Sequence, residues 1–355
     1  MKILIDIGHP GHVHLFKHFA HEMIRKGHAI FFTCREKEFE VQLLKAEGFN
    51  FVSFGKKYKT TAGKIFGLFK FDFQELFQGI KFKPDLFLSH GSPYAAHAAA
   101  VLMTPHVSFE DTGNMEQVKL YLPFTKNVLT STAFHKDLGI KQLKYNGYHE
   151  LAYLHSNYFT ANENIYDLLK INKNEKFVIL RFVSWKASHD INQSGLSLDE
   201  KRTVISLLEI KYKIFISSEG ELPDEFKKYQ IKIPPEEIHH ALAFASLFIG
   251  EGATMASECA MLGTPAIYIN TITAGTIDEQ VKYGLIFHFK STENLTEKIK
   301  ELLIKPDLKE EFKNKQVKML NDKIDVTAFL IWFVENFPKS STIMRENPNY
   351  QNNFK

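Results

Sequence analysis

The sequence is poor in cysteine and lacks any long apolar run, and each absence excludes a class of protein. Cys34 and Cys259 are the only cysteines among 355 residues, so the chain carries neither a disulfide framework nor a cysteine zinc site. The first apolar run, KILIDI, includes Asp6 and is too short for a secretory signal. No run approaches the roughly 18 apolar residues that span a bilayer. We therefore expect a cytoplasmic protein.

Net charge is also low. The formal charge is only +3, which does not predict nucleic-acid binding. The charge is uneven, however, because residues 54–84 contain seven lysines, two acidic residues and eight aromatic residues. Two interpretations stay open: peripheral contact with an anionic membrane surface, or an ordinary helix that packs in a core beneath solvated lysines. The second interpretation is favoured by the helical spacing of the apolar residues in this range. These are Ile65, Phe66, Phe69, Phe73, Leu76, Phe77 and Ile80.

Short apolar runs alternate with helical patterns along the chain, which predicts α/β domains with parallel sheets covered on both faces. One series occupies residues 1–155 and a second occupies residues 165–322, with a polar, Asn-rich segment between them. We expect a Rossmann-like domain in each range. An apolar helix at 323–337 is expected to pack back on the first domain, and 338–355 is expected to be a polar, disordered tail.

The strongest candidate site lies in the second domain, in the sequence GEGATMASECAMLGTPAIYIN, which starts at Gly250. A strand ends there, and a helix is expected from about Ala253 until Gly263 ends it. The first N–H groups of such a helix form an anion site, to which Thr254 adds a hydroxyl. Glu258, one turn later, is suited to accept the hydroxyls of a ribose. The alternative is a packing helix with a solvated glutamate.

This segment resembles the donor-binding helix of MurG-type glycosyltransferases. In those enzymes a Gly-Ala turn meets the diphosphate of the donor, and a Ser-Glu pair one turn later supplies the ribose-binding carboxylate. Carried over residue by residue, the resemblance implies phosphate contacts by Gly252, Ala253 and Thr254 and a ribose contact by Glu258. It also implies that the second domain binds a nucleotide sugar.

Three further segments match in the same order. They are IGHPGHVHLF, which resembles the first glycine loop, PDLFLSHGSPYAAHAAAVLMTPHVSFEDTGN, which resembles the acceptor side, and YNGYHEL, which resembles the end of the first domain. The stretches RFVSWKASHD and SSEGELP resemble the domain-of-unknown-function family 354, over nearly the whole chain. These resemblances imply a GT-B fold, in which two Rossmann-like domains face each other across a cleft, related to MurG-type glycosyltransferases and UDP-N-acetylglucosamine 2-epimerases.

The chain departs from the MurG pattern beside the diphosphate, where it has Glu251. An acid there is unfavourable unless its side chain points away or a cation intervenes. Arg181, at the end of a strand, is a further phosphate candidate, with Lys186 as a second positive charge and His189-Asp190 as a neighbouring pair; its alternative role is an interdomain salt bridge. No Asp-x-Asp motif occurs, so we expect no obligatory metal, and helix dipoles and basic side chains would offset the leaving-group charge.

The chain begins with an unusual density of histidine. Six of its sixteen histidines lie between residues 9 and 28. His14, His18 and His21 fall on the polar side of the expected helix and are expected to be solvated, although His14 could still reach the cleft as an acceptor contact. His12 lies in the glycine turn with Gly11, at the carboxyl end of the first strand, where ligands of parallel sheets bind. It is therefore the expected catalytic base, with Gly11 on the phosphate side.

Other candidates follow later strands of the first domain. His90 and Ser92, in SHGSP, are expected to contact the acceptor or the sugar. Glu110 and Asp111 follow the next strand, where paired carboxylates could act as a base or bind sugar hydroxyls. The alternative for this pair is a structural turn. Glu110 is the second expected catalytic residue, and Asp111 is assigned to sugar or acceptor contacts.

Together these features favour a GT-B glycosyltransferase with a nucleotide-diphosphate sugar donor, UDP-sugar being favoured, in cell-surface polysaccharide or glycolipid biosynthesis. Its partners would be the nucleotide sugar and a glycan or lipid-linked acceptor, with peripheral membrane contact through 54–84 and no nucleic acid. The first alternative is a non-hydrolysing nucleotide-sugar 2-epimerase, with Glu110 and Asp111 near the sugar. The second is a nucleotide-sugar-binding protein without turnover, which the acidic Glu251 favours.

Overall fold

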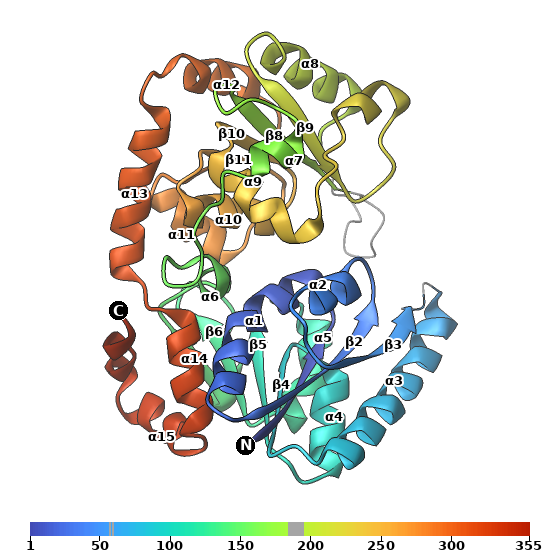
Figure 1. Ribbon diagram of the computed structural model, residues 1–355. Helices are drawn as coiled ribbons and strands as arrows, with labels where there is room; N and C mark the ends of the chain where they lie inside the picture. Colours follow the sequence, from blue (N-terminus) through green and yellow to red (C-terminus); the bar gives the residue numbers. More distant parts are fainter. Residues whose placement is uncertain (57, 59, 184–194) are drawn as a thin grey trace. The chain divides into compact units, whose positions relative to one another are not determined.

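The computed structural model describes residues 1–56, 58, 60–183 and 195–355 and divides the chain into two compact units (Figure 1). Unit 1 comprises residues 1–158 and 323–355, and unit 2 comprises residues 159–322. Each unit is built on its own parallel sheet, with helices on both faces. The predicted α/β class is therefore confirmed.

The sheet of unit 1 has the strand order β3-β2-β1-β4-β5-β6-β7, and every neighbouring pair is parallel. Its strands are nearly continuous apolar runs because both faces are covered. The order reverses direction between β1 and β4, which is where ligands of such sheets bind. The strands are β1 (Lys2–Ile7), β2 (Ala29–Glu36), β3 (Phe51–Lys56), β4 (Leu86–His90), β5 (His106–Glu110), β6 (Asn127–Ser131) and β7 (Gln142–Tyr145).

The helices of unit 1 form two groups. One group, which includes the C-terminal helix α14, packs around α1, and the other packs α3 against α4 and α4 against α5 (Figure 1). The helices are α1 (Pro10–Arg25), α2 (Glu40–Ala46), α3 (Thr61–Phe82), α4 (Pro93–Val101), α5 (Met115–Tyr121), α6 (Leu151–Leu154), α14 (Val326–Glu335) and α15 (Lys339–Glu346), with 3₁₀ turns η1 (Leu122–Phe124), η2 (Gly139–Lys141) and η5 (Pro348–Phe354).

Unit 2 has the strand order β12-β11-β10-β8-β9, again parallel throughout. Its largest core lies between one face of the sheet and helices α8 and α12. The strands are β8 (Phe177–Phe182), β9 (Lys213–Ser218), β10 (Leu247–Gly250), β11 (Ala266–Ile269) and β12 (Ile286–Phe289). The helices are α7 (Ile165–Leu169), α8 (Leu198–Leu208), α9 (Ile238–Phe244), α10 (Ala253–Leu262), α11 (Gly275–Lys282), α12 (Leu295–Ile304) and α13 (Leu308–Asp322), with 3₁₀ turns η3 (Asp224–Tyr229) and η4 (Pro235–Glu237).

Unit 1 contains a buried ion pair beneath the carboxyl end of β1. Arg35 on β2 donates two hydrogen bonds to Asp6, at 2.6 and 2.8 Å, and neither residue is more than 2% exposed. Asp6 also accepts the hydroxyls of Thr33 and Ser92. Burial and the nearby Asp6 raise the pKa of Glu75, on α3, well above its usual value. The raised pKa favours the neutral form of Glu75 beside the Asp6–Arg35 pair.

Three expectations about exposure are wrong. The tail is not disordered, because residues 339–346 form α15 and residues 348–354 form η5. Most of the apolar residues of α3 do not pack in a core, because its phenylalanines at positions 66, 69, 73 and 77 are exposed. His14 is buried rather than solvated: α6 covers that side of α1, and the ring of Tyr153 lies 5.3 Å from that of His14. A helical wheel cannot show which neighbour covers each side.

Within the described ranges, none of the helices is long and apolar enough to cross a bilayer.

Candidate functional site

The strand–helix turn of unit 2 has the geometry of an anion site. β10 ends at Gly250 and α10 starts at Ala253, with Gly252 in extended conformation at the N-cap and no side chain capping the helix. A side chain at Gly250 would place its Cβ 2.8 Å from that of Arg181, so only glycine fits here. The first N–H groups of α10 face outward from the helix start, next to the exposed Thr254. Gly263 ends the helix at φ +71°, as the sequence predicts.

Glu251 turns away from this helix start. Its carboxylate is buried and accepts the backbone N–H groups of Val183 at 2.8 Å and of Leu196 at 2.6 Å. Lys201 lies 4.0 Å from the same carboxylate. Of the two ways in which an acid could be tolerated beside a diphosphate, the structure shows the first, a side chain that points elsewhere. This orientation removes the observation that favoured a nucleotide-sugar-binding protein without turnover.

Arg181 lies beside the glycine turn but is already engaged. Its guanidinium donates to Ser217 at 2.8 Å and to Glu219 at 2.9 Å, so its salt bridge lies within unit 2 rather than between domains. A phosphate contact by Arg181 stays a prediction and would compete with Glu219. Lys186 and the His189-Asp190 pair lie outside the described residues.

Glu258 is the second part of the nucleotide hypothesis. It lies on α10, 6% of its side chain is exposed, and it accepts a hydrogen bond at 3.0 Å from Nε2 of His239 on α9. Next to it, Ser257 accepts a hydrogen bond from Gln280, so the following turn of α10 is held by α11. The carboxylate is thus fixed one turn after the start of α10 rather than solvated, and its ribose contact stays a prediction.

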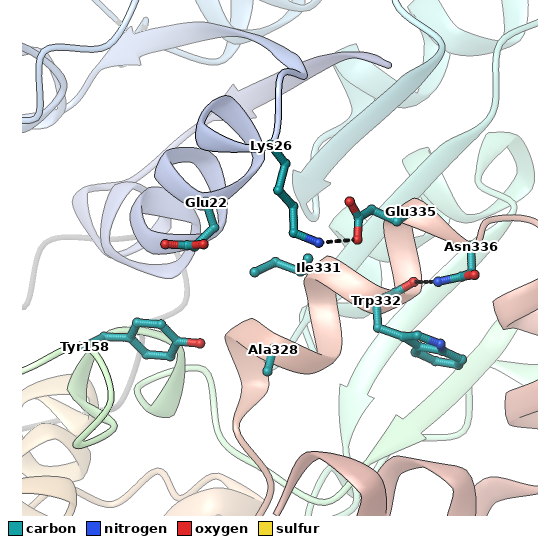
Figure 2. Close-up of a pocket in the computed structure, with 8 residues that line it drawn as sticks. All are labelled: Glu22, Lys26, Tyr158, Ala328, Ile331, Trp332, Glu335 and Asn336. Carbon is teal, nitrogen blue, oxygen red and sulfur yellow. Dashed lines mark hydrogen bonds and ion pairs between the residues drawn. The ribbon is translucent and has the colours of Figure 1, made fainter.

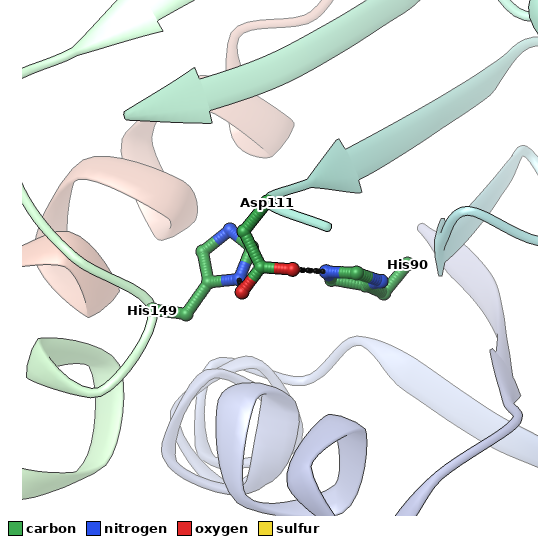
Figure 3. Close-up of side chains that lie close together, drawn as sticks. All are labelled: His90, Asp111 and His149. Atoms are coloured by element: carbon green, nitrogen blue, oxygen red, sulfur yellow. Dashed lines mark hydrogen bonds and ion pairs between the residues drawn. The ribbon is translucent and has the colours of Figure 1, made fainter. Parts of the chain in front are cut away.

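Unit 1 gathers polar side chains at the carboxyl ends of its strands. His90 ends β4, Asp111 follows β5, and His149 follows β7. Figure 3 shows Asp111 between the two imidazoles: Nε2 of His90 lies 2.9 Å from Oδ1, and Nδ1 of His149 lies 2.9 Å from Oδ2. Gly91 has φ +59°, a conformation that favours glycine and turns the chain sharply after His90.

The charges in this cluster support one another. Burial alone would raise the pKa of Asp111, but the adjacent His149 and His90 lower it well below its usual value. Burial opposes a charge on His90, yet Asp111 and Glu110 outweigh it and raise the pKa of His90 above its usual value. Asp111 is therefore ionised at neutral pH, and both imidazole nitrogens that face it must carry a proton.

His12 joins this cluster. Its ring stacks on that of His90 with centroids 4.4 Å apart. Its Nδ1 accepts the backbone N–H of Gly8 at a long 3.3 Å, so the neutral ring carries its proton on Nε2. His9 caps α1 by accepting the N–H of Gly11, and a Cβ at Gly11 would press on that ring at 3.3 Å. The structure thus gives Gly11 a role in the loop; its phosphate contact stays a prediction.

Two predicted residues are used by the fold itself. Oε1 of Glu110 accepts both the N–H and the hydroxyl of Thr112, together with the N–H of Gly113, while Oε2 accepts the hydroxyl of Tyr121. Ser92 is 4% exposed, caps α4 and donates to Asp6. These contacts favour the structural turn for Glu110 and place Ser92 at the start of α4. The catalytic role of Glu110 and the acceptor contacts of Ser92 and His14 stay predictions.

One group could hold a metal ion. Within the described part of the chain, the ligand atoms of His90, Asp111 and His149 all lie within 4.8 Å of one another, and such a donor set suits first-row transition metals. Each imidazole faces a different carboxylate oxygen, which is the pattern of a hydrogen-bonded His–Asp–His group. A metal would have to displace both ring protons. The absence of an obligatory metal stays a prediction.

Sequence patterns missed two members of these sites. His149 lies in YNGYHEL, a segment that was matched only to the end of the first domain of MurG-type enzymes and was given no site residue. Nothing in the local sequence shows that the chain after β7 reaches Asp111. His239 precedes an apolar run, and its contact with Glu258 depends on the packing of α9 against α10. Both are contacts between elements distant in sequence.

A hollow of unit 1 lies apart from all predicted residues. It lies between α1 and α14, measures about 460 Å³ and is lined by the residues in Figure 2. Its principal charged groups already pair, because Lys26 Nζ lies 2.6 Å from Glu335. Nothing in its lining matches the predicted chemistry.

The fold resembles that of several nucleotide-sugar enzymes. A UDP-GlcNAc 2-epimerase from Neisseria meningitidis, bound to UDP-GlcNAc, superposes with a TM-score of 0.65 at 14% identity, over 94% of this chain and 99% of that one. A UDP-GlcNAc 2-epimerase from Methanocaldococcus jannaschii gives 0.63 at 13% identity, over 86% and 93%. A Streptomyces sp. SF2575 glycosyltransferase gives 0.59 at 11% identity, over 95% and 100%.

These identities show the fold alone, which is GT-B. No curated protein matches the sequence. A family match covers residues 1–334, and the chain therefore belongs to the family described as Protein of unknown function (DUF354).

Proposed function

We propose that the protein is a glycosyltransferase that moves a sugar from a nucleotide diphosphate, UDP being favoured, to a hydroxyl of a glycan or lipid-linked acceptor in cell-surface polysaccharide or glycolipid biosynthesis. The observation that carries the proposal is the cluster of His12, His90, Asp111 and His149 at the carboxyl ends of the strands of unit 1. Transfer to a hydroxyl needs a general base, and a histidine that stacks on a carboxylate-bound histidine is suited to this chemistry.

Unit 2 binds the donor in this proposal. The N-terminus of α10, with Gly252, Ala253 and Thr254, receives the diphosphate, where free N–H groups and the helix dipole stabilise the charge that develops on the leaving group. Glu258, fixed by His239, accepts the ribose hydroxyls. This arrangement offsets the leaving-group charge without requiring a metal ion.

Unit 1 supplies the base. His12 is half-buried, whereas His90 is 8% exposed, so His12 is the member that reaches the acceptor hydroxyl. To accept a proton on Nε2 it takes the other tautomer, in which Nδ1 no longer accepts the N–H of Gly8. The negative charge of the ionised Asp111, on the far side of His90, stabilises the imidazolium that forms. Asp111 thus acts through His90 as a positioning residue.

A 2-epimerase is the second candidate, favoured by the higher TM-score of the Neisseria epimerase and by the adjacent Glu110 and Asp111. Epimerisation at a sugar carbon needs one group that removes a proton and another that returns it. One oxygen of Glu110 accepts from its own loop and the other accepts the hydroxyl of Tyr121 at the end of α5, which weighs against this candidate.

The two reactions give different products from the same incubation. The protein is incubated with UDP-sugars, with and without a panel of glycan acceptors; free UDP is measured and the sugar is identified by NMR. We expect UDP release only when an acceptor is present. The His12→Ala variant should bind UDP normally. Its rate of acceptor-dependent sugar transfer, measured as UDP formed, should be roughly 10²–10⁴ times lower, the usual loss on removing a general base. Isomerised sugar without any acceptor would identify an epimerase instead. Binding with neither product would identify a binding protein.

The ribose assignment makes a separate prediction. Glu258→Ala should weaken UDP binding by about 1.5–3 kcal/mol, the range for hydrogen bonds to a charged group, as measured by titration calorimetry. Glu297→Ala, which removes an exposed carboxylate from α12 in the same unit, is the matched control and should bind as the wild type does. Equal affinity of the wild type and Glu258→Ala would refute the assignment.

A further inference from the structure

Helix α3 presents an apolar face to solvent. Five large side chains along it are between 54% and 70% exposed, namely Phe66, Phe69, Phe73, Phe77 and Ile80. Their spacings of three and four residues place them in one stripe along the helix. The other side of α3 packs on unit 1, where Phe71 is 2% exposed and Glu75 is fully buried. An exposed stripe of four phenylalanines is unusual for a surface helix, because such a helix normally buries its apolar side.

Neighbouring elements extend this surface. Leu102, at the end of α4, packs on Gly79 of α3, and beside it Val101 and Met103 are 65% and 94% exposed. His97 on α4 bonds Asp72 of α3 and the carbonyl of Leu120, so α5 and η1 continue the same side. There the exposed apolar side chains are Leu120 and Phe124. We call the α3 stripe with Val101, Met103, Leu120 and Phe124 the apolar face.

The charges around the apolar face are mostly positive. Lys81 and Lys83 are exposed at the end of α3, and Lys119 and Lys126 are exposed on and after α5, against two exposed acids, Asp85 and Glu116. The acid on α3 nearest the stripe, Asp72, is paired with His97. Basic side chains beside exposed phenylalanines match a surface that offers anionic headgroups above an apolar layer.

We propose that the apolar face docks unit 1 on an anionic lipid bilayer, with α3 lying in the plane of the membrane interface. The phenylalanines enter the headgroup–acyl boundary, and the lysines contact the phosphates. A second copy of the chain fits less well, because a two-fold contact would bring the same lysines of both copies together. The proposal does not depend on the reaction, although it would place the enzyme at a lipid-linked acceptor.

Flotation with vesicles tests the proposal on the full-length protein. We expect binding to vesicles of phosphatidylcholine with phosphatidylglycerol, weaker binding to phosphatidylcholine alone, and loss of binding at high salt. The double variant Phe69→Ser/Phe73→Ser should bind at least roughly tenfold more weakly, because it removes two of the inserted side chains. Ile210→Ser/Ile304→Ser is the matched control, since both isoleucines are 76% exposed in unit 2, and it should bind as the wild type does.

Far-ultraviolet circular dichroism and melting of both double variants check that the fold is intact; the four side chains are all exposed, so we expect no change. Lys81→Glu/Lys83→Glu should abolish the preference for phosphatidylglycerol and leave the melting temperature unchanged. Three results would overturn the proposal: no flotation of the wild type, equal flotation of Phe69→Ser/Phe73→Ser, or a stable dimer by light scattering that this variant converts to monomer. The last result would assign the apolar face to self-association.

Discussion

Asp111→Asn is expected to lower the rate of sugar transfer by roughly 10²–10⁴-fold while nucleotide binding stays unchanged. The carboxylate accepts a hydrogen bond from an imidazole on each of its oxygens, His90 on one and His149 on the other. An amide keeps only one acceptor oxygen, so its NH₂ group must face the N–H of one of the two rings. That ring then changes tautomer or moves, and the negative charge that stabilises an imidazolium is lost.

The pH profile distinguishes a catalytic role from a structural one. Asp111 holds the pKa of His90 above its usual value, and a protonated His90 opposes a second positive charge on the stacked His12. The substitution lowers the pKa of His90 and should therefore shift the acidic limb of the residual activity to lower pH. A merely structural role would lower the melting temperature without moving that limb. Thr112→Ala, two residues from Glu110 in the same loop, is the control for loop damage, since it leaves the His–Asp–His group unchanged. Full activity of Asp111→Asn would contradict the proposed base.

Asp6→Ala should destabilise unit 1 by about 3–5 kcal/mol, because it leaves the guanidinium of Arg35 buried without its carboxylate. Arg35 is 2% exposed and donates to both oxygens of Asp6, while burial raises the pKa of Glu75 and so disfavours a replacement negative charge there. Urea unfolding followed by tyrosine and tryptophan fluorescence measures the loss. The double variant Asp6→Ala/Arg35→Met should recover a large part of it, since it removes the unpaired charge as well.

A surface ion pair provides the contrast. Glu335→Ala breaks a contact of 2.6 Å with Lys26, but both side chains are more than 25% exposed, so we expect a loss of at most about 1 kcal/mol. If Asp6→Ala costs no more than this control, the buried pair does not hold the carboxyl ends of β1 and β2 in place. The position of Ser92, which donates to Asp6, would then need another explanation.

Local sequence patterns predicted the architecture because they are themselves the cause of it. Continuous apolar strands followed by glycine or proline require parallel sheets covered on both faces, and the start of α10 and its end at Gly263 follow from cap chemistry. Exposure was harder to predict. The spacing of the α3 phenylalanines identifies one side of a helix, but it does not say whether that side faces a core or solvent.

The candidate site was predicted in part for the same reason. His12, His90 and Asp111 each follow a strand, and parallel strands bring their carboxyl ends to one edge. His149 depends on how the chain returns after β7, and the pairing of Glu258 with His239 depends on helix packing. Glu110 illustrates the reverse: it ends β5 next to Asp111, yet its own loop occupies one of its oxygens and Tyr121 of α5 occupies the other.

Nucleotide binding tests the account most directly. The measurement is the melting temperature of the full-length protein with UDP, GDP, CMP, dTDP and their sugars, for the wild type and for Glu258→Ala. A ligand at 100 times its dissociation constant adds about 2.7 kcal/mol of stability, enough to raise the melting temperature measurably. We predict that UDP and UDP-sugars raise the melting temperature of the wild type and raise that of Glu258→Ala much less. If none of these nucleotides raises the melting temperature of the wild type, the protein is not a nucleotide-sugar enzyme.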